Sequence, residues 1–476
     1  MGCTRQQQEH KVTEEVYTQL EDVLCNTRQQ LVDYMEMIQA KARSIDEDAL
    51  MLSFFKAKKD YYHLKQEIEI PPPMVHKIEE LKQSIQAHYL NRYLVFYDIL
   101  FIDTDGNIFY TIRKQNDYQK NIFSEQFKDM TLAGEMKQRP SESFVDFQFY
   151  HISGEPSAFF IEPVKLDNEL AGWFVFQCSI NKINSIFSID KNLGATGEVF
   201  LVNREHYMLT DSRFRAESTI LQLRLSDDNI SGKFKDEKGR KTVVDYRGNK
   251  VLSVFETFSF LESEWLIIAK INEAEVLTRY YVENRDKIED ELEKVIPRTR
   301  PVYHDYFPVD DRVIEVDIDE FKRAGRDTVL YTHGLSTCTA ITISYPGKFA
   351  YMAHVSPYDK IYGENRTDML GQLLKRITYL EIADSEKGEL RFTIISPGVK
   401  ESVATLNRIV DNGYFLSQVK IMLNPAALYG NASSIFKTGE TVVNWKMSED
   451  DNTFLTQYST DVPSIGSKLK QYLGDF

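Results

Sequence analysis

The first part of the chain, residues 9–69, constrains the fold more than any other feature of the sequence. It is rich in Glu, Gln, Lys, Leu and Met, and its apolar residues recur at the spacing of one helix face. These residues are Val16, Leu20, Leu24, Leu31, Tyr34, Met35 and Ile38. The run Pro71-Pro72-Pro73 ends the pattern, and another helix is expected at 74–88. The sequence therefore predicts one long helix or a helical pair, followed by a further helix.

Strand patterns take over after the helices. Residues 93–102 lead into a turn signal at 103–107, and residues 108–112 are expected to return as a hairpin partner. A second hairpin is expected from residues 157–164 and 171–179. These segments predict an antiparallel sheet.

The same pattern recurs in the next part of the chain. Strands are expected at residues 197–203, 250–258 and 264–271. A long helix followed by two successive antiparallel sheets is typical of a tandem sensor. The predicted fold class is therefore α+β, with two sheet modules after the N-terminal helix.

Three segments of this region resemble the double Cache domain of bacterial chemoreceptors and sensor kinases. They are Ile102-Asp103-Thr104-Asp105-Gly106-Asn107-Ile108-Phe109-Tyr110-Thr111, Leu193-Gly194-Ala195-Thr196-Gly197-Glu198-Val199-Phe200-Leu201-Val202 and Leu209-Thr210-Asp211-Ser212-Arg213-Phe214. The resemblance covers about residues 30–281 and implies two PAS-like modules. The helical region would be 1–92, the membrane-distal module 93–190 and the membrane-proximal module 191–271.

The ligand of such a sensor is less well specified by the sequence. The amino-acid-binding version of the family carries an R-x-W-Y element, and residues 123–131 contain none, so recognition of amines or amino acids is not implied. The first module has more aromatic residues than a small sheet needs for its core, and it is therefore expected to hold the sensory pocket. The candidate ligand-binding residues are Tyr110, Tyr118, Phe147, Tyr150 and Trp173. The alternative is that they fill the interface between sheet and helices.

A second chemical signal lies beyond a charged, helical linker expected at 272–300. Cys338 ends a turn of small residues, and His354 follows sixteen residues later on an apolar segment. Strands expected at 328–331, 339–343 and 349–353 would bring the two together. Sulfur attacks as thiolate, so a neighbouring imidazole that accepts its proton favours nucleophilic chemistry. The alternative is packing, because free cysteine is among the most buried residue types.

The C-terminal part, from about residue 312 to 447 within a domain expected at 301–476, resembles the CheD family of receptor glutamine deamidases. The family's T-L-G-L-G-S-C turn stands here as Thr332-His333-Gly334-Leu335-Ser336-Thr337-Cys338, and its G-M-A-H strand as Tyr351-Met352-Ala353-His354. Its N-I-G-x-R-N-V-E-A-V segment resembles residues 396–406, and its closing hairpin resembles Gly439-Glu440-Thr441-Val442-Val443. The family's G-G-N-x-x-R loop is replaced by Ala427-Leu428-Tyr429-Gly430-Asn431-Ala432.

This resemblance implies a separate α/β domain and a catalytic set of Cys338, His354 and Thr332. The implied reaction is deamidation of a protein glutamine to glutamate and ammonia, controlled by a small ligand and needing no cofactor. The partners would be a glutamine-bearing protein and the sensor ligand. The alternative is a non-catalytic signalling protein whose CheD-like domain only docks a partner.

Charge and cysteine spacing exclude several other classes. The 57 basic and 72 acidic residues give a net charge of -15, which argues against nucleic acid as a partner. Cys3, Cys25, Cys178 and Cys338 lie far apart without C-x-x-C spacing, so neither a metal site nor a disulfide framework is expected. A homodimer through the N-terminal helix is a further candidate partner.

The compartment is predicted from family habits and the first residues. Met1-Gly2-Cys3 is compatible with the end of a lipobox, and no run of eighteen apolar residues occurs. Cache sensors usually face outward, whereas receptor deamidation takes place in the cytoplasm. The expected location is extracytoplasmic, with a lipid anchor at Cys3, and the alternative is cytoplasmic.

Overall fold

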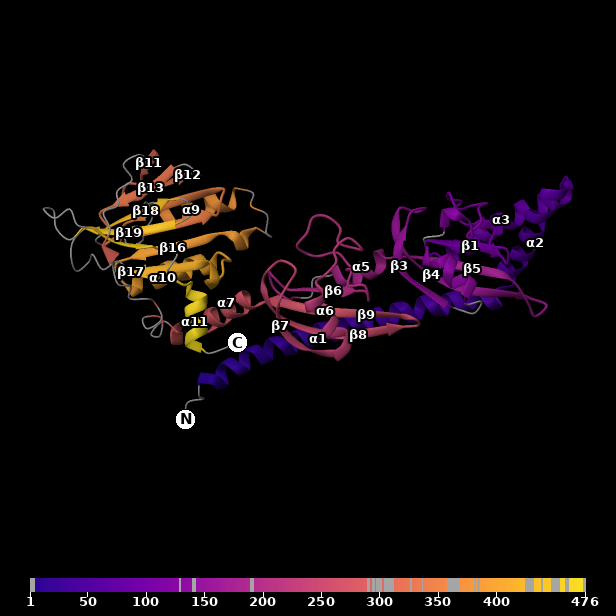
Figure 1. The fold of residues 1–476 in the computed structure, drawn as a ribbon, viewed down its shortest axis with the longest axis horizontal. Coiled ribbons are helices and arrows are strands. Elements are labelled where there is room, and N and C mark those ends of the chain that lie inside the picture. The colour runs from indigo at the N-terminus through magenta and orange to yellow at the C-terminus, as the bar shows by residue number, and fades with distance from the viewer. Residues whose placement is uncertain are drawn as a thin grey trace. The chain divides into compact units, whose positions relative to one another are not determined.

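The structure is a computed structural model of the chain. It describes residues 5–127, 130–138, 143–188, 192–288, 292, 296, 302–303, 312–325, 328–335, 337–357, 368–380, 382, 386–423, 432–437, 440–446, 454–458 and 462–473. The chain divides into two compact units (Figure 1). The two-module unit is Tyr17–Ile271, and the C-terminal unit combines Met1–Val16 with Asn272–Phe476. The helix α1 (Arg5–Arg43) contributes residues to both units.

The first module is a five-stranded antiparallel sheet in the order β2-β1-β5-β4-β3. Its strands are β1 (Asp98–Asp103), β2 (Ile108–Thr111), β3 (Ser143–Tyr150), β4 (Glu155–Leu166) and β5 (Glu169–Ser179). Both predicted hairpins are present. Asp167 and Asn168 join β4 to β5 with φ of 54° and 66°, the left-handed conformation that Asp and Asn tolerate in two-residue hairpins.

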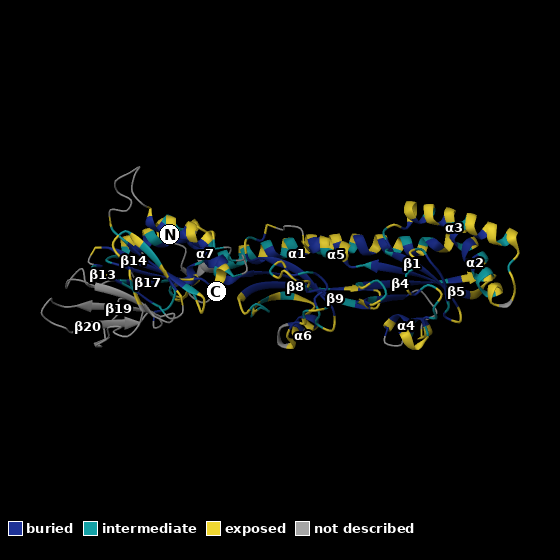
Figure 2. Ribbon diagram, turned by 90° about the horizontal axis from the view of Figure 1, so that it is seen from above, coloured by how far each residue is buried: buried dark blue, intermediate teal, exposed yellow. Residues whose placement is uncertain are grey.

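A helical pair covers one face of this sheet. The helix α2 (Ala49–Glu67) packs on the strands through Phe54 and Phe55, and α3 (Pro72–Arg92) packs against α2. Asp48 caps α2 by accepting from Met51 N, and it also bonds His88 of α3 at 2.6 Å. The outward side of α3 is exposed (Figure 2).

The other face of the sheet carries the module's core. The short elements η2 (Glu125–Phe127) and α4 (Thr131–Gln138) cover it with apolar side chains. These pack on Leu100, Ile102, Phe159 and Val175. The first module is therefore a sheet between two helical layers.

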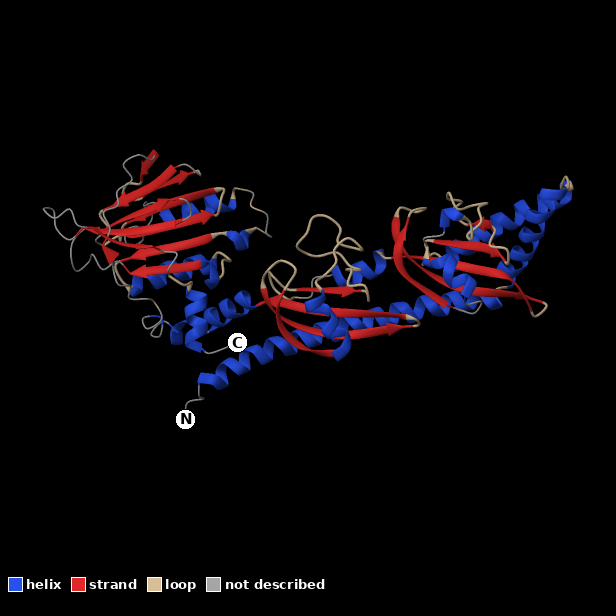
Figure 3. Cartoon of the chain, viewed as in Figure 1, coloured by secondary structure: helices blue, strands red, loops and turns tan. Residues whose placement is uncertain are grey.

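The second module is a four-stranded sheet in the order β6-β9-β8-β7 (Figure 3). Its strands are β6 (Glu198–Val202), β7 (Lys238–Val244), β8 (Lys250–Phe260) and β9 (Ser263–Asn272), and its helices are α5 (Asn181–Ser188) and α6 (Asp227–Asp236). α6 packs on one face of β7 and β8. α1 lies on the opposite face, where Glu21 pairs with Arg240 at 2.7 Å and Arg28 with Glu256 at 3.1 Å.

The C-terminal unit contains two sheets. One has the order β10-β20-β19-β18-β13-β11, and the other β12-β15-β14-β16-β17. The strands are β10 (Val302–Tyr303), β11 (Arg312–Glu315), β12 (Glu320–Ala324), β13 (Thr328–His333), β14 (Thr339–Tyr345), β15 (Phe349–Val355), β16 (Arg391–Ser396), β17 (Val419–Leu423), β18 (Ala432–Lys437), β19 (Glu440–Lys446) and β20 (Phe454–Tyr458).

Helices cover one face of the five-stranded sheet. They are α7 (Glu273–Glu283), α9 (Met369–Thr378), α10 (Val399–Asp411) and α11 (Ile465–Leu473), with the short turns η3 (Lys387–Glu389) and η4 (Leu416–Gln418). Ile341 and Ala353 face these helices. Met352, one residue earlier on β15, packs instead with Leu330 of the other sheet. Because side chains alternate along a strand, His354 lies on the side of Met352, toward β13.

The observed elements differ from the predicted ones in identifiable ways. Residues 93–97 form turns rather than strand, and β1 begins at Asp98. The strand β7 and the helix α6 carry few apolar residues and were not predicted. The α7 part of the expected linker contributes Leu277 and Tyr281 to the core of the C-terminal unit. The short helix therefore packs as part of that unit and not as a solvated spacer.

Candidate functional sites

Thr332 and His354 are in direct contact in the C-terminal unit, and Cys338 adjoins the start of β14, the strand that pairs with the strand of His354. Thr332 is the second-last residue of β13, and Cys338 immediately precedes β14. The turn between them contains Gly334 at φ 75°, a left-handed conformation that favours glycine. β14 pairs with β15 so that Ala340 faces His354. Cys338 packs with Ala340, Ile395 and Met422 in one apolar cluster.

The hydrogen bonds of Thr332 determine the tautomer of His354. The Thr332 hydroxyl donates its single proton to the carbonyl oxygen of Val316, at 2.6 Å. The same oxygen lies 2.8 Å from Nδ1 of His354 and must therefore act as the acceptor there. Nδ1 then carries the ring proton, and Nε2 carries a lone pair. Nε2 is buried and has no hydrogen-bond partner in the described part of the chain.

Burial favours the neutral forms of both the Cys338 thiol and the His354 imidazole. His354 is 2% exposed, and desolvation lowers its pKa to about 4. Desolvation also raises the pKa of the Cys338 thiol, although a hydrogen bond with Thr337 opposes this. A resting thiolate–imidazolium pair is thus disfavoured. The arrangement suits a neutral imidazole that accepts the thiol proton during attack.

The other segments compared with the deamidase family lie on different sheets: residues 396–406 adjoin the five-stranded sheet, and residues 440–443 of the expected closing hairpin belong to β19 of the six-stranded sheet. Residues 396–406 form the end of β16 and the start of α10, with Gly398 as the N-cap residue. Ser396 and Ser402 are fully buried and bond each other there. Residues 427–431 of the altered loop lie outside the described residues.

The five residues expected to bind a ligand lie in different packing environments. Tyr150 and Trp173 belong to the core beneath α4, whereas Tyr110 lies against Phe54 of α2 with ring centroids 4.8 Å apart. Phe147 contacts Trp265 of β9 at 6.0 Å between centroids, and Tyr118 is half-buried. The structure brings two of the five together, and their role in binding stays a prediction.

Several buried polar atoms of the first module have no hydrogen-bond partner among the described residues, and Asp117 Oδ1 and Trp173 Nε1 are two of them; the others include Asp98 Oδ2, Gln115 Oε1, Ser143 Oγ, Gln148 Nε2 and Gln177 Oε1. The Tyr150 hydroxyl donates to Oδ2 of Asp117 at 2.7 Å, which leaves Asp117 Oδ1 without a hydrogen bond in the described residues. Trp173 Nε1 is likewise buried without an acceptor among them. Burial raises the pKa of Asp117. Unpaired buried polar atoms are rare and indicate places where a ligand or water binds.

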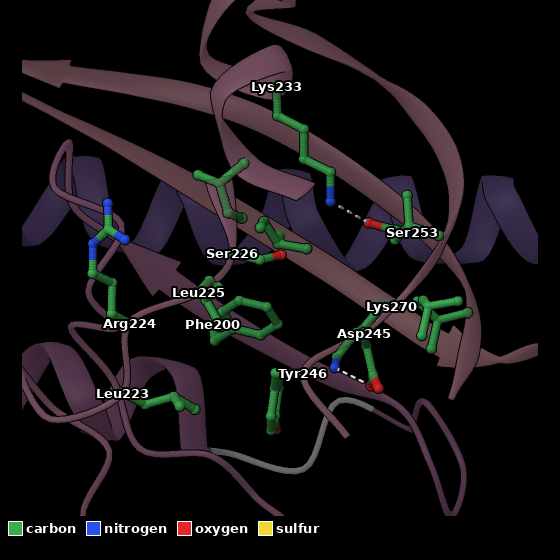
Figure 4. Close-up of a pocket in the computed structure, with 15 residues that line it drawn as sticks. Phe200, Leu223, Arg224, Leu225, Ser226, Lys233, Asp245, Tyr246, Ser253 and Lys270 are labelled. Atoms are coloured by element: carbon green, nitrogen blue, oxygen red, sulfur yellow. Dashed lines mark hydrogen bonds and ion pairs between the residues drawn. The ribbon is translucent and has the colours of Figure 1, made fainter. Parts of the chain in front are cut away.

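A cavity of about 340 Å³ lies in the second module, between α6 and the sheet (Figure 4). Its apolar lining includes Phe200, Leu225, Ile230, Val251 and Ile268. Its polar lining includes Arg224, Ser226, Lys233, Asp245, Tyr246, Ser253 and Lys270. The expectation that the first module holds the sensory pocket did not foresee this space.

Two lysines in this cavity have different surroundings. Lys270 is 2% exposed and lies between two carboxylates, 2.9 Å from Glu198 Oε1 and 2.5 Å from Asp245 Oδ2. Lys233 is 3% exposed, and its one hydrogen bond in the described structure is to Ser253 Oγ, at 3.3 Å. Burial lowers the pKa of Lys233 to about 8, and Lys270 and Lys241 add repulsion.

The sequence held a signal for both lysines that the prediction missed. Lys270 interrupts the apolar run Leu266-Ile267-Ile268-Ala269, where a charge requires a buried partner. Lys233 follows Ile230 by three residues and so shares its buried helix face. Charged residues at apolar positions of the sequence were therefore a better guide to this cavity than the number of aromatic residues.

Metal-binding clusters and membrane-spanning helices are both missing from the described residues. These residues contain no group of three or more His, Cys, Asp or Glu side chains that would hold a metal ion. None of their helices combines the length and apolarity needed to cross a membrane. Cys3, the expected lipid-anchor residue, lies outside the described part of the chain.

Several solved structures that match part of this chain are ligand-binding domains of bacterial receptors. An extracellular ligand binding receptor from Desulfohalobium retbaense is 13% identical over 53% of this chain and 40% of that chain, with a TM-score of 0.36. The ligand-binding domain of the Pseudomonas aeruginosa amino acid chemoreceptor PctB, in complex with L-Gln, is 16% identical. The match covers 59% of this chain and 99% of that chain, with a TM-score of 0.35. The ligand-binding domain of the Pseudomonas fluorescens chemoreceptor CtaA, in complex with L-isoleucine, is 12% identical. The match covers 57% of this chain and 96% of that chain, with a TM-score of 0.36. These values are too low to transfer a ligand to this chain.

The family comparison covers more than half of the chain. No curated protein matches the sequence. The dCache_1 family model, described as a Cache domain, matches residues 6–280. This range includes α1, both modules and most of α7. The chain therefore belongs to the Cache domain family of ligand sensors.

Proposed function

We propose that this protein is a signalling sensor in which a small molecule bound by the Cache modules changes the output of the C-terminal unit. The observation that carries the proposal is the family match over both modules. The unpaired Asp117 Oδ1 and Trp173 Nε1 support binding in the first module. The first is a carboxyl oxygen and the second an N–H donor, so a small polar molecule could bond to either.

A thermal-shift screen of the full chain tests the sensing role. The library contains amino acids, organic acids, amines, sugars and nucleosides, and a ligand at 100 times its Kd stabilises by about 2.7 kcal/mol. A ligand of the first module should lose its shift in Asp117→Asn and Trp173→Phe. The exposed-turn variant Asp167→Asn is the control. Failure of every compound to raise the melting temperature would contradict the proposal.

A second candidate function is specifically favoured by the C-terminal geometry. Cys338 would act as the nucleophile of a cysteine hydrolase, and the resemblance to CheD deamidases makes a protein glutamine the expected substrate. The supporting observation is the hydrogen bond between Thr332 Oγ1 and His354 Nδ1, which leaves Nε2 as a free base. If the domain only docks a partner, this tautomer has no chemical use.

The proposed reaction has two steps. Cys338 Sγ attacks the carboxamide carbon while His354 Nε2 accepts the thiol proton. The C–N bond then breaks, and His354 returns that proton to the nitrogen, which leaves as ammonia. His354 next removes a proton from water, whose oxygen attacks the thioester carbon. The C–S bond then breaks to release the glutamate side chain, and His354 returns the proton to the Cys338 sulfur. Thr332 is a positioning residue throughout, since it holds the Nδ1–H tautomer.

Ammonia release from a glutamine-bearing chemoreceptor fragment tests this candidate. Cys338→Ala should abolish release, whereas Cys25→Ala removes an exposed free cysteine and should leave the rate unchanged. Equal rates of ammonia release in wild type and Cys338→Ala would contradict catalysis, and docking of a partner would then be the function of the C-terminal unit. An extracytoplasmic location and a homodimer through α1 remain further proposals, to be tested by fractionation and by sedimentation.

A further inference from the structure

We propose that the cavity in the second module is a binding site for a small monocarboxylate with an apolar body. It is distinct from the predicted pocket of the first module, and it is defined by side chains of α6, β7, β8 and β9. Its volume of about 340 Å³ lies within the range of small-molecule pockets.

The negative charge of the ligand follows from Lys233. This side chain is 3% exposed and points into the cavity from α6 (Figure 4). Its hydrogen-bond partner is the neutral Ser253 hydroxyl at 3.3 Å, and its Nζ lies 5.5 Å from the centroid of the Phe255 ring. No carboxylate pairs with it in the described structure. A buried ammonium without a counterion is costly, so such groups are normally paired. A ligand carboxylate near Lys233 Nζ would supply the missing charge.

The other charged groups of the lining already have partners within the protein. Lys270 bonds Asp245 and Glu198, and Asp245 also accepts from Arg247 Nε at 2.9 Å. Arg224 pairs with Asp227 at 2.9 Å. Lys233 is thus the one buried cation of this lining for which the described structure shows no carboxylate. A ligand with one negative charge therefore matches this lining better than a ligand with two.

The apolar part of the ligand follows from the remaining walls. Phe200, Leu225, Ile230, Val251 and Ile268 surround the space on the side of the sheet and of α6. They favour an aliphatic chain or an aromatic ring, whose burial contributes roughly 25 cal/mol per Å². They also disfavour a zwitterionic amino acid. Its ammonium would compete with Lys270 and Arg247 for Asp245, the one carboxylate of the lining.

Isothermal titration of the full chain with hexanoate and benzoate tests the proposal. We expect saturable binding, weakened at least tenfold for leucine and for hexan-1-ol, which lack a net charge. Lys233→Met keeps the length and apolar stem of the side chain, and it should weaken hexanoate binding at least tenfold. Lys238→Met removes an exposed cation of β7 whose partner is Glu256, and it should change binding less than twofold.

The outcomes separate this site from the proposed sensing function. Absence of hexanoate and benzoate binding to folded wild type, or equal binding in wild type and Lys233→Met, overturns the assignment. Loss of binding in Asp117→Asn but not in Lys233→Met would also overturn it, because the carboxylate would then bind the first module. In each case the sensing function stands if another compound stabilises the chain. Circular dichroism of each variant shows that it is folded.

Discussion

The indole N–H of Trp265 lies 3.0 Å from Oδ1 and 2.9 Å from Oδ2 of Asp146, so one donor faces both oxygens of a carboxylate. Trp265 belongs to β9 of the second module, and Asp146 to β3 of the first. Phe144 and Phe147 of β3 also contact the Trp265 ring. This small polar contact within aromatic packing joins the two modules of one unit.

The Asp146 carboxyl should make stability depend on pH. Burial raises its pKa to about 6 from an ordinary value near 3.8. Its stabilising contribution is therefore complete below about pH 3.8 and is lost as the pH rises through 6. Asp146→Asn keeps an acceptor for Trp265 without the charge, and it should melt higher than wild type at pH 8 but not at pH 4. Parallel melting profiles across this range would contradict the shifted pKa.

Alkylation of Cys338 reports on the catalytic pair. Because burial raises the thiol pKa, iodoacetamide should label Cys338 more slowly at pH 7 than the exposed Cys25, measured by mass spectrometry of the same sample. His354→Ala should slow labelling further and reduce turnover by roughly 10²-fold or more. Equal labelling rates of Cys338 in wild type and His354→Ala would mean that Cys338 has a structural role.

Thr332 should affect turnover through the histidine tautomer. Thr332→Val removes the hydroxyl that accepts from Nδ1, and it should lower kcat while leaving KM within about twofold. Thr332→Ser retains the hydroxyl and should restore most of the rate. Equal loss in both variants would indicate that the methyl group of Thr332, and not its hydroxyl, matters. Ammonia release measures both.

Gly172 should tolerate no side chain. It lies in β5 at φ 150°, and a Cβ there would stand 2.0 Å from the carbonyl oxygen of Ile102 on β1. Gly172→Ala should destabilise the protein by several kcal/mol or prevent folding, because the backbone of β1 must move. At Gly134 of α4, by contrast, an added Cβ would meet no atom within 4 Å among the described residues. Gly134→Ala should therefore stabilise by about 0.5–1 kcal/mol, as thermal melting can show.

The two buried lysines should respond in opposite directions to loss of charge. Lys270→Met leaves Glu198 and Asp245 buried without their cation and should cost about 3–5 kcal/mol. Lys233→Met removes a cation repelled by Lys270 and Lys241, and it should raise stability in the absence of ligand. The gain should shrink as the pH passes through 8, where Lys233 becomes neutral. Urea denaturation of wild type and both variants at pH 7 and pH 9 measures these changes in the free energy of unfolding.

The parts of the fold that were predictable have strong local patterns. The apolar face of α1 and the hairpin of β4 and β5 follow from spacing and from Asp167-Asn168. The closeness of Thr332 and His354 was implied by the family resemblance, whereas the strand pattern predicted only that Cys338 and His354 meet, which stays a prediction. The tautomer of His354 was not predictable, because it depends on the carbonyl of Val316, which only the fold places there. The edge strand β7 alternates polar residues on both faces and carries no periodic apolar signal.

The hairpin of β14 and β15 determines which length changes this site can tolerate. The turn Pro346-Gly347-Lys348 fixes Tyr345 opposite Phe349, and from there alternation carries His354 to the same face of the sheet as its cross-strand partner Ala340. One residue inserted between Phe349 and His354 would turn the imidazole toward the helices, away from Thr332. An insertion of two residues would return His354 to its original face of the sheet but would shift its pairing with β14 by two positions. A lengthened β15 therefore keeps the pair only if a β-bulge absorbs the extra residue, so the evolutionary record of this strand should show substitutions in place of insertions.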